Sequence, residues 1–177
     1  LIQILEEPGR EGINELMREA DLIVATGSGQ VVRAAYSSGT PAYGVGQGNA
    51  VAIVAEDADV AQAATMICGS KLFDYATSCS SENAAIAVEA VYDAFVAELK
   101  KNHCHLVAGE DREKLKNHMW KLNARGKYAL NPDIIAKSAA HIARGAGIAI
   151  PEGTDILLVE GTEPILDDRF HDEKISP

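Results

Sequence analysis

Basic residues are scarce in this 177-residue sequence, in which 16 lysines and arginines stand against 26 aspartates and glutamates. The resulting formal charge of −10 at pH 7 argues against nucleic acid or an anionic membrane as the main partner, because both attract positively charged surfaces. No stretch approaches the roughly 18 apolar residues of a membrane-spanning helix, and no signal-peptide pattern follows Leu1. We therefore expect a protein of the cytoplasm that acts on a small metabolite.

Cysteine is also rare. Cys68, Cys79 and Cys104 are odd in number and form no Cys-x-x-Cys pair, which disfavours a disulfide framework and a structural zinc site. His103 and His105 flank Cys104, but no further cluster of metal ligands accompanies them, so we expect no metal. Cys68 lies on the apolar face of a helical pattern and is expected in the core. These features fit a reducing compartment.

Apolar strand patterns alternate with helical patterns along the chain. We expect strands at residues 1–5, 22–26, 41–45, 51–54, 84–90, 145–150 and 156–159, and helices at residues 10–20, 31–39, 60–68, 91–99, 112–122 and 131–143. The charged helix at 112–122 is expected to turn its charges toward solvent. Alternation of this kind predicts an α/β chain with largely parallel sheets. The glycine-rich span 44–48 is the best candidate for a domain boundary.

A candidate anion site follows the continuous apolar run 22–26, which is typical of a parallel strand buried on both faces. The run ends at Gly27-Ser28-Gly29, and a helical pattern begins directly after it. Strand, Gly/Ser turn and helix in this order can direct the N–H groups of the helix at a phosphate. An ordinary turn with Ser28 as the helix cap stays open as the alternative, because the GxGxxG fingerprint is absent.

A candidate nucleophile, Cys79, stands in the polar run Ser78-Cys79-Ser80-Ser81. Serine is a weak helix former that prefers caps and turns, so this run marks the place where a helix begins or ends. Free backbone N–H groups at such a place favour the thiolate form of a cysteine, which is the reactive form. The alternative is a buried structural cysteine, although three neighbouring hydroxyls are rare at an apolar packing position.

Six short motifs stand in a distinctive order and spacing. They are Ala25-Thr-Gly-Ser28, Ala34-Ala-Tyr-Ser-Ser-Gly39, Gly44-Val-Gly-Gln-Gly-Asn49, Phe73-Asp74, Cys79-Ser-Ser-Glu-Asn83 and His171-Asp-Glu-Lys-Ile-Ser-Pro177. Taken together, they resemble the CoA-acylating branch of the aldehyde dehydrogenase superfamily, which includes acetaldehyde, propionaldehyde and sulfoacetaldehyde dehydrogenases. The resemblance implies an aldehyde dehydrogenase-like fold, with residues 1–46 as the end of a Rossmann-type NAD(P)-binding domain and residues 47–177 as part of the catalytic domain.

The resemblance also implies roles for single residues. Cys79 matches the nucleophile, which forms a thiohemiacetal with the aldehyde and, after hydride leaves for the nicotinamide, a thioester. Thr26-Gly27-Ser28 matches the turn at the cofactor pyrophosphate, and Glu173 matches the glutamate that holds the nicotinamide ribose. Gly46, where the backbone can approach closely, is expected beside the cofactor. The implied reaction converts an aldehyde, CoA and NAD+ or NADP+ to acyl-CoA and the reduced cofactor.

Val45 stands where hydrolytic relatives carry their glutamate general base, in a gapless register counted back from Cys79. The acidic run Glu56-Asp-Ala-Asp59 matches the motif between these two positions and supports the register. Valine cannot activate a water, so the thioester is expected to persist until CoA accepts the acyl group. A hydrolytic or semialdehyde dehydrogenase relative is disfavoured for this reason. A non-catalytic module with the same fold stays open as a further alternative.

The resemblance carries expectations about the whole protein. It implies a homo-oligomer with a short aldehyde and CoA as partners and with no nucleic acid or membrane, in the cytoplasm or inside a bacterial microcompartment. It places the first nucleotide-binding units of the family before Leu1 and the remaining catalytic lobe after Pro177. We therefore expect the isolated 177-residue chain to have negligible dehydrogenase activity.

Overall fold

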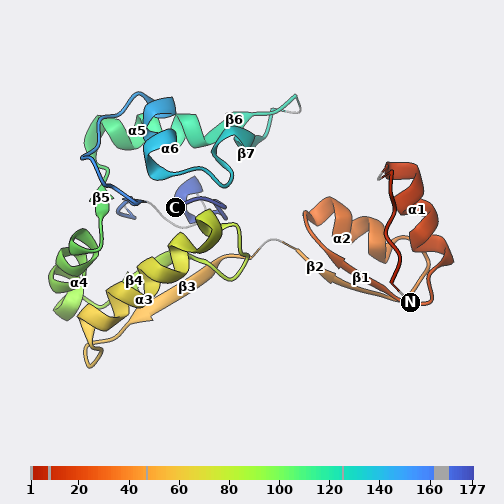
Figure 1. The fold of residues 1–177 in the computed structure, drawn as a ribbon, viewed down its shortest axis with the longest axis horizontal. Coiled ribbons are helices and arrows are strands. Elements are labelled where there is room, and N and C mark those ends of the chain that lie inside the picture. The colour runs from red at the N-terminus through yellow and green to blue at the C-terminus, as the bar shows by residue number, and fades with distance from the viewer. Residues whose placement is uncertain (1, 8, 47, 125, 162–167) are drawn as a thin grey trace. The chain divides into compact units, whose positions relative to one another are not determined.

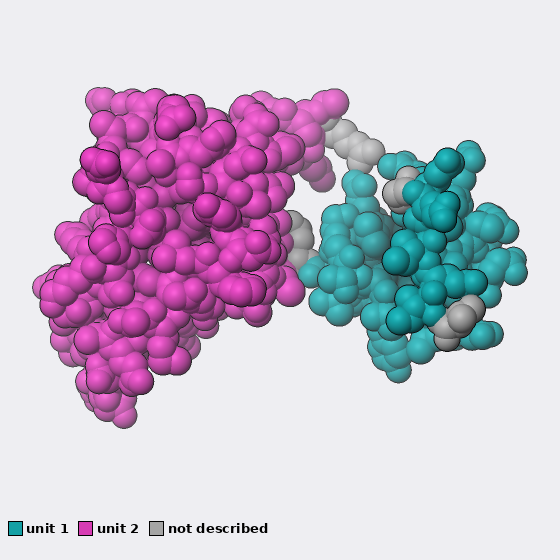
Figure 2. Space-filling view, viewed as in Figure 1, with its two compact units in different colours: residues 1–47 teal, residues 48–177 magenta. Residues whose placement is uncertain are grey.

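The computed structural model describes residues 2–7, 9–46, 48–124, 126–161 and 168–177. The chain divides into two compact units, unit 1 with residues 1–47 and unit 2 with residues 48–177, drawn as ribbons in Figure 1 and in two colours in Figure 2. Each unit has its own buried apolar residues. Within the described ranges, every helix is too short or too polar to traverse a lipid bilayer.

Unit 1 packs helices against a parallel strand pair. Its elements are α1 (Arg10–Glu19), β1 (Ile23–Thr26), α2 (Gly29–Tyr36) and β2 (Ala42–Val45). β1 and β2 pair in parallel, with Ile23 opposite Ala42 and Thr26 opposite Val45. Since side chains alternate between the faces of a strand, one face of the pair carries the small core and the other does not.

The second face of the β1–β2 pair is open. Val24 and Tyr43 lie opposite each other there and are 73% and 68% exposed. The expectation that residues 22–26 are buried on both faces is therefore wrong, because Met17 of α1 and Ala35 of α2 pack against the same side of the strands. Residues 2–5, expected as part of a strand, lie outside any strand or helix.

Unit 2 continues the alternation of strands and helices. Its strands are β3 (Ala50–Val54), β4 (Glu82–Ala87), β5 (Cys104–Leu106), β6 (Trp120–Leu122), β7 (Tyr128–Leu130) and β8 (Ile156–Leu158). Its helices are α3 (Val60–Leu72), α4 (Glu89–Lys101), α5 (Gly109–Met119) and α6 (Ala139–Ala146), with 3-10 turns η1 (Phe73–Ala76), η2 (Pro132–Ile134) and η3 (Arg169–His171). The pairs β3–β4 and β5–β8 are parallel and β6–β7 is antiparallel. The prediction of an α/β chain with largely parallel sheets is confirmed for the described residues.

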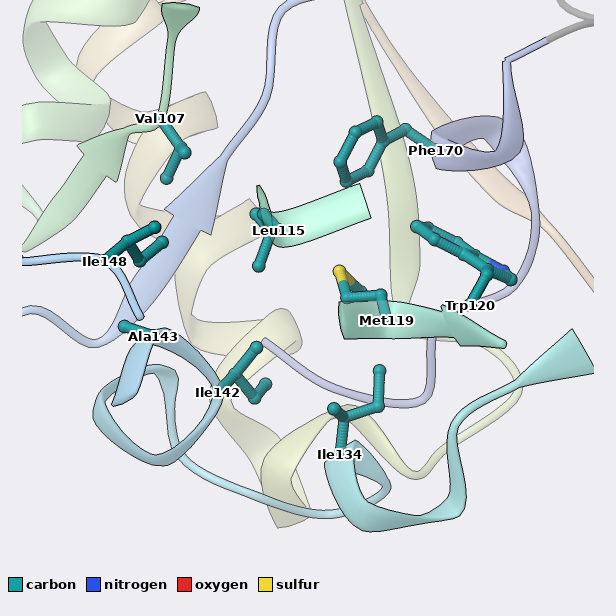
Figure 3. Packing of buried hydrophobic residues seen from close by; sticks show 9 residues of the cluster. All are labelled: Val107, Leu115, Met119, Trp120, Ile134, Ile142, Ala143, Ile148 and Phe170. Atoms are coloured by element: carbon teal, nitrogen blue, oxygen red, sulfur yellow. The ribbon is translucent and has the colours of Figure 1, made fainter. Parts of the chain in front are cut away.

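Two apolar clusters hold unit 2 together. The first lies among β3, α3, α4, β5 and β8 and buries Val54, Ala64, Cys68, Phe95, Leu99, Cys104 and Ile156. The second centres on α5 and α6 (Figure 3), where Trp120 packs edge-on against Phe170 with ring centroids 5.2 Å apart. The expected core position of Cys68 is confirmed. The first cluster anchors α3, from which the loop that carries Cys79 begins.

Helix α5 begins and ends three residues earlier than the expected helix at 112–122. It ends at Met119, and Trp120 adopts extended backbone (φ −122°, ψ 129°) and pairs with Leu130 in β6–β7. The extended residue directs its indole ring into the core against Phe170. The last part of the predicted helix is therefore wrong, because packing of one large side chain outweighs the weak local preference for helix.

Two charged side chains of α5 turn inward, while Glu113 and Lys114 remain exposed to solvent. Arg112 and Lys116 are buried beside the enclosed carboxylate of Asp168, at N–O distances of 2.5 and 3.5 Å. Burial opposes ionisation of Asp168, but a hydrogen bond from the N–H of Phe170 and the two cations outweigh it and hold the pKa of the carboxyl below its usual value. The expected solvated face is therefore confirmed for Glu113 and Lys114 but wrong for Arg112 and Lys116, because a residue distant in the sequence supplies their buried partner.

The region between β7 and β8 also differs from expectation. Asn131 caps only the short turn η2, and Ala136 then adopts a left-handed φ of 56°, which ends the helical path. A separate helix, α6, starts after the Ser138 cap and closes at Gly147 with φ of 69°. The predicted continuous helix at 131–143 and the strand at 145–150 are therefore wrong, because the latter's first residues complete α6.

Candidate functional site

Cys79 lies in the loop that joins α3 and η1 to β4. The N–H of Ser81 donates to the carbonyl of Ser78 at 3.0 Å, so Cys79 is a central residue of a tight turn directly after the end of η1. Its side chain is exposed. Cys68 and Cys104, by contrast, are buried in the first core cluster, with their sulfurs 3.4 Å apart. The structural-cysteine alternative thus describes those two residues and not Cys79.

Three consecutive residues before this turn have left-handed backbone. Asp74, Tyr75 and Ala76 have φ of 49°, 51° and 59°. Left-handed conformation costs an L-residue about 1–2 kcal/mol, so surrounding contacts must hold it. The Thr77 hydroxyl donates to the Asp74 carboxylate at 2.6 Å, and the Ala76 methyl is buried. The fold thereby keeps the Cys79 loop in a shape that the isolated segment would not prefer.

The same loop packs against Gly48. A Cβ atom on Gly48 would lie 3.1 Å from the carbonyl oxygen of Cys79, which is closer than ordinary van der Waals contact. Because glycine has no Cβ atom, Gly48 allows this close approach of the two backbone segments. The loop of Cys79 therefore rests on backbone rather than on a side chain.

Thr26, Gly27 and Ser28 form the turn between β1 and α2 in unit 1. The N–H of Gly27 donates to the carbonyl of Val45 at 3.1 Å. Ser28 is the residue before α2, and its hydroxyl makes no capping hydrogen bond. The first N–H groups of a helix have no partners within the helix, so the turn has donors for an anion. The expected order of strand, turn and helix is confirmed.

Val45 ends β2 at the same edge of the parallel pair, and Gly46 follows it directly. Thr26 lies opposite Val45, so these positions adjoin the turn before α2. The Val45 side chain is 55% exposed and apolar, as the sequence requires. A Cβ atom on Gly46 would have Val32 as its nearest side chain at 4.0 Å, so crowding within unit 1 does not require glycine there. The carboxyl ends of parallel strands are the usual place for ligands.

Glu173 lies shortly after η3, in the same unit as Cys79. Two hydrogen bonds tie its segment to the strands around the Cys79 loop. The N–H of Lys174 donates to the side-chain oxygen of Asn83 at 3.2 Å, and the side-chain amide of Asn49 donates to the carbonyl of His171. The structure therefore brings the segments of Cys79 and Glu173 to the same part of unit 2.

A cavity of 490 Å³ in unit 2 lies between β4 and the pair β5–β8. Its polar lining includes Lys71, Glu82, Asn83 and Lys174. Burial lowers the pKa of Lys71 to about 8, although the Glu82 carboxylate acts in the opposite direction. Burial and, second, the charge of Lys71 lower the pKa of Lys174 to about 7. Sequence reasoning missed this cluster, because a lysine beside apolar residues usually extends to solvent.

The histidines around Cys104 do not assemble a metal site. Cys104 begins β5 and its sulfur contacts Cys68, while His103 has a left-handed φ of 61°. In the part of the chain that the structure describes, no group of three or more histidine, cysteine, aspartate or glutamate side chains could hold a metal ion.

Comparisons with known proteins add independent findings. The sequence matches the aldehyde dehydrogenase family over residues 1–166. It is 84% identical over 177 residues to the acylating sulfoacetaldehyde dehydrogenase of Bilophila wadsworthia. That match covers 100% of this chain and 38% of the Bilophila protein. An acetylating aldehyde dehydrogenase from Geobacillus thermoglucosidasius has a TM-score of 0.89 at 40% identity, over 97% of this chain and 37% of that one. A Rhodopseudomonas palustris propionaldehyde dehydrogenase with bound CoA and an acylated cysteine has a TM-score of 0.84 at 28% identity, over 97% and 38%.

The matches agree in sequence and in fold. They extend over nearly all of this chain, which itself spans 38% of the length of the Bilophila protein. The resemblance inferred from the six motifs is confirmed by them. The chain belongs to the aldehyde dehydrogenase family.

Proposed function

We propose that this chain is the nucleophile-bearing part of a CoA-acylating aldehyde dehydrogenase. The observation that carries the proposal is the exposed Cys79, presented on a loop that follows three left-handed residues and rests on Gly48. Strained backbone is often found at functional sites, and three consecutive left-handed residues lie shortly before the Cys79 turn. The 84% identity to a protein named as an acylating dehydrogenase supports the same activity.

In the proposed reaction, the sulfur of Cys79 attacks the carbonyl carbon of the aldehyde. The carbonyl oxygen becomes the oxyanion of a thiohemiacetal, for which the backbone N–H of Cys79 is the proposed donor. Bound NAD(P)+ would accept the hydride from that carbon, which leaves a thioester on Cys79. The thiolate of CoA then attacks the thioester carbon, the bond to Cys79 breaks, and acyl-CoA leaves with the enzyme thiolate restored.

Val45 explains why CoA rather than water would accept the acyl group. Water needs a general base to become a useful nucleophile near neutral pH, whereas a thiol ionises far more readily. The apolar side chain of Val45 offers no such base at the position that the motif register assigns to it. A hydrolytic dehydrogenase is therefore the less favoured second candidate.

Each unit contains hydrogen-bonding groups that suit one part of a nicotinamide cofactor. The N-terminal N–H groups of α2 and the uncapped hydroxyl of Ser28 suit a pyrophosphate, with Thr26 and Gly27 forming the turn. Gly46 would let the backbone approach the cofactor, and the Glu173 carboxylate can accept hydrogen bonds from ribose hydroxyls. We propose residues 1–46 as the end of the NAD(P)-binding domain and residues 47–177 as part of the catalytic domain.

The names of the relatives suggest the substrate class. We propose a short aldehyde, with sulfoacetaldehyde as the first to test because of the Bilophila relative. We further propose a cytoplasmic homo-oligomer. The cytoplasm suits an exposed, reactive thiol, since reducing conditions keep it from forming disulfides.

The test uses the longest natural polypeptide that contains these 177 residues. With NAD+ or NADP+, CoA and sulfoacetaldehyde or acetaldehyde, it should form the acyl-CoA and the reduced cofactor, and Cys79→Ala should abolish both. Ser80→Ala, at the neighbouring exposed position, is the matched control and should retain activity. Rapid release of the carboxylic acid in the absence of CoA would establish the hydrolytic alternative, and absence of any turnover would favour a non-catalytic module.

A further inference from the structure

We propose that Asn49 and Asn83 are positioning residues, which clamp the segment that carries Glu173 onto the loop that carries Cys79. Their effect would be to set the distance between the ribose contact of the cofactor and the reacting sulfur. The inference rests on the proposed function, because it gives Glu173 and Cys79 their roles.

The two asparagines belong to two segments that adjoin the Cys79 loop. Asn83 is the second residue of β4, four residues after Cys79, and Asn49 directly follows Gly48, on which the loop rests. Both reach the same distant segment, 91 and 122 residues further along the chain. Asn49 bonds to His171 and Asn83 to Lys174, so Glu173 lies between the two attachment points.

The clamped segment is also closed upon itself. The ammonium of Lys174 donates to the carbonyls of Phe170 and Asp172, at 2.7 and 3.0 Å. A segment held together internally in this way behaves as one rigid piece. The hydrogen bonds at its two ends therefore fix the position of Glu173 as well. None of these hydrogen bonds uses the carboxylate of Glu173, so that carboxylate can accept hydrogen bonds from a ligand.

The geometry gives the two amides opposite tasks. Toward the clamped segment, the side chain of Asn83 accepts a hydrogen bond through its oxygen, whereas that of Asn49 donates one through its nitrogen. Asn83 also donates to the carbonyl of Ser81, at the longer distance of 3.5 Å. Aspartate keeps the acceptor of asparagine and loses the donor. It should therefore serve in place of Asn83, where the bond from the N–H of Lys174 remains and only the 3.5 Å contact to Ser81 is lost. It should not serve in place of Asn49, where it would face a carbonyl oxygen.

The crossed substitutions provide the test in the longest natural polypeptide that contains this chain. Asn83→Ala, Asn49→Ala and Asn49→Asp should each raise the KM for the nicotinamide cofactor about tenfold, the equivalent of one hydrogen bond. Asn83→Asp should stay within about twofold of the parent enzyme. Asn14→Ala and Asn14→Asp, on the exposed face of α1, are the matched controls and should change nothing.

Two further readouts separate positioning from general damage. The rate at which iodoacetamide alkylates Cys79 and the thermal midpoint should be similar in Asn49→Asp and Asn83→Asp, while their KM values differ. Equal KM values in these two variants would overturn the inference, as would an effect on the thermal midpoint alone. If an alanine variant fails to fold, the comparison of KM between Asn49→Asp and Asn83→Asp still tests the inference. A parent polypeptide without aldehyde turnover would overturn the proposed function and this inference with it, whereas an active parent with indifferent variants overturns the inference alone.

Discussion

The carbonyl oxygen of Cys79 lies 3.1 Å from the place that a Cβ atom on Gly48 would occupy. The neighbour is backbone, which cannot swing aside as a flexible side chain would. A methyl group there must displace the loop by a few tenths of an ångström, and with it the sulfur proposed to attack the substrate. Gly48 and Cys79 are 31 residues apart in the sequence, and this approach couples their backbone positions at the candidate site.

Gly48→Ala is expected to lower kcat/KM about tenfold to a hundredfold, because small displacements of a reacting group are costly. Steady-state kinetics of the longest natural polypeptide would measure this. Gly69→Ala, in α3 with no atom within 4 Å of the new methyl, is the matched control. It should keep activity and raise the unfolding free energy by about 0.5–1 kcal/mol, since alanine is the better helix former. Equal activity of both variants would contradict the coupling.

Cys79 should be alkylated far faster than the other two cysteines. It is exposed, while Cys68 and Cys104 are buried and hydrogen-bonded to each other. Iodoacetamide followed by peptide mass spectrometry should mark Cys79 first and the buried pair only after addition of denaturant. Similar rates at all three positions in the folded protein would argue against an accessible nucleophile.

Replacing Tyr75 should relieve strain next to the site. Tyr75 is exposed and has φ of 51°, so Tyr75→Gly should raise the unfolding free energy by about 1 kcal/mol despite the entropy that glycine loses on folding. Phe73, also exposed, has an ordinary φ of −59°, and Phe73→Gly should instead destabilise the protein. Urea denaturation of the two variants gives the comparison. A loss of stability in Tyr75→Gly as large as that in Phe73→Gly would count against the strain.

Asp168→Asn should be strongly destabilising, by about 3–5 kcal/mol, because it removes the buried carboxylate that Arg112 and Lys116 both contact. The exposed pair of Asp111 and Lys114 provides the control, and Asp111→Asn should cost less than about 1 kcal/mol. The folded-state pKa of Asp168 lies below the usual value. Its contribution should thus be complete above the unfolded pKa of ~3.9 and be lost as the pH falls through the lowered one. Acid titration of stability should show this loss in the parent and not in Asp168→Asn.

Stability should rise with pH above neutrality, because of Lys71 and Lys174. Their pKa values in the folded state are about 8 and about 7, whereas an unfolded lysine titrates near ~10.4. Between these values the unfolded state binds more protons, so the unfolding free energy increases with pH. Urea denaturation at pH 6.5, 8 and 9.5 should reveal the slope, and Lys174→Met should reduce it. Lys114→Met, at a surface position, should leave the slope unchanged.

The sequence by itself determined the order of strands and helices wherever local pattern and tertiary demand agree. The apolar runs of β1, β3 and β8 fall where the periodicity places them, and α3 begins directly after the acidic run that ends at Asp59. The turn at Thr26–Ser28 and the polar loop at Cys79 could also be predicted, because glycine and serine disfavour continuation of regular structure at those points. Family resemblance was readable for the same reason, since its motifs are short and contiguous.

Only the tertiary structure decided the features that depend on partners distant in the sequence. It turned Trp120 into a strand residue to pack its ring on Phe170, and it buried Arg112 and Lys116 around Asp168. It also joined Asn49 and Asn83 to the segment of Glu173. No local sequence pattern predicts these contacts. The physical reason is common to all: hydrogen bonds, ion pairs and ring contacts form across space, whereas propensity acts only between neighbours along the chain.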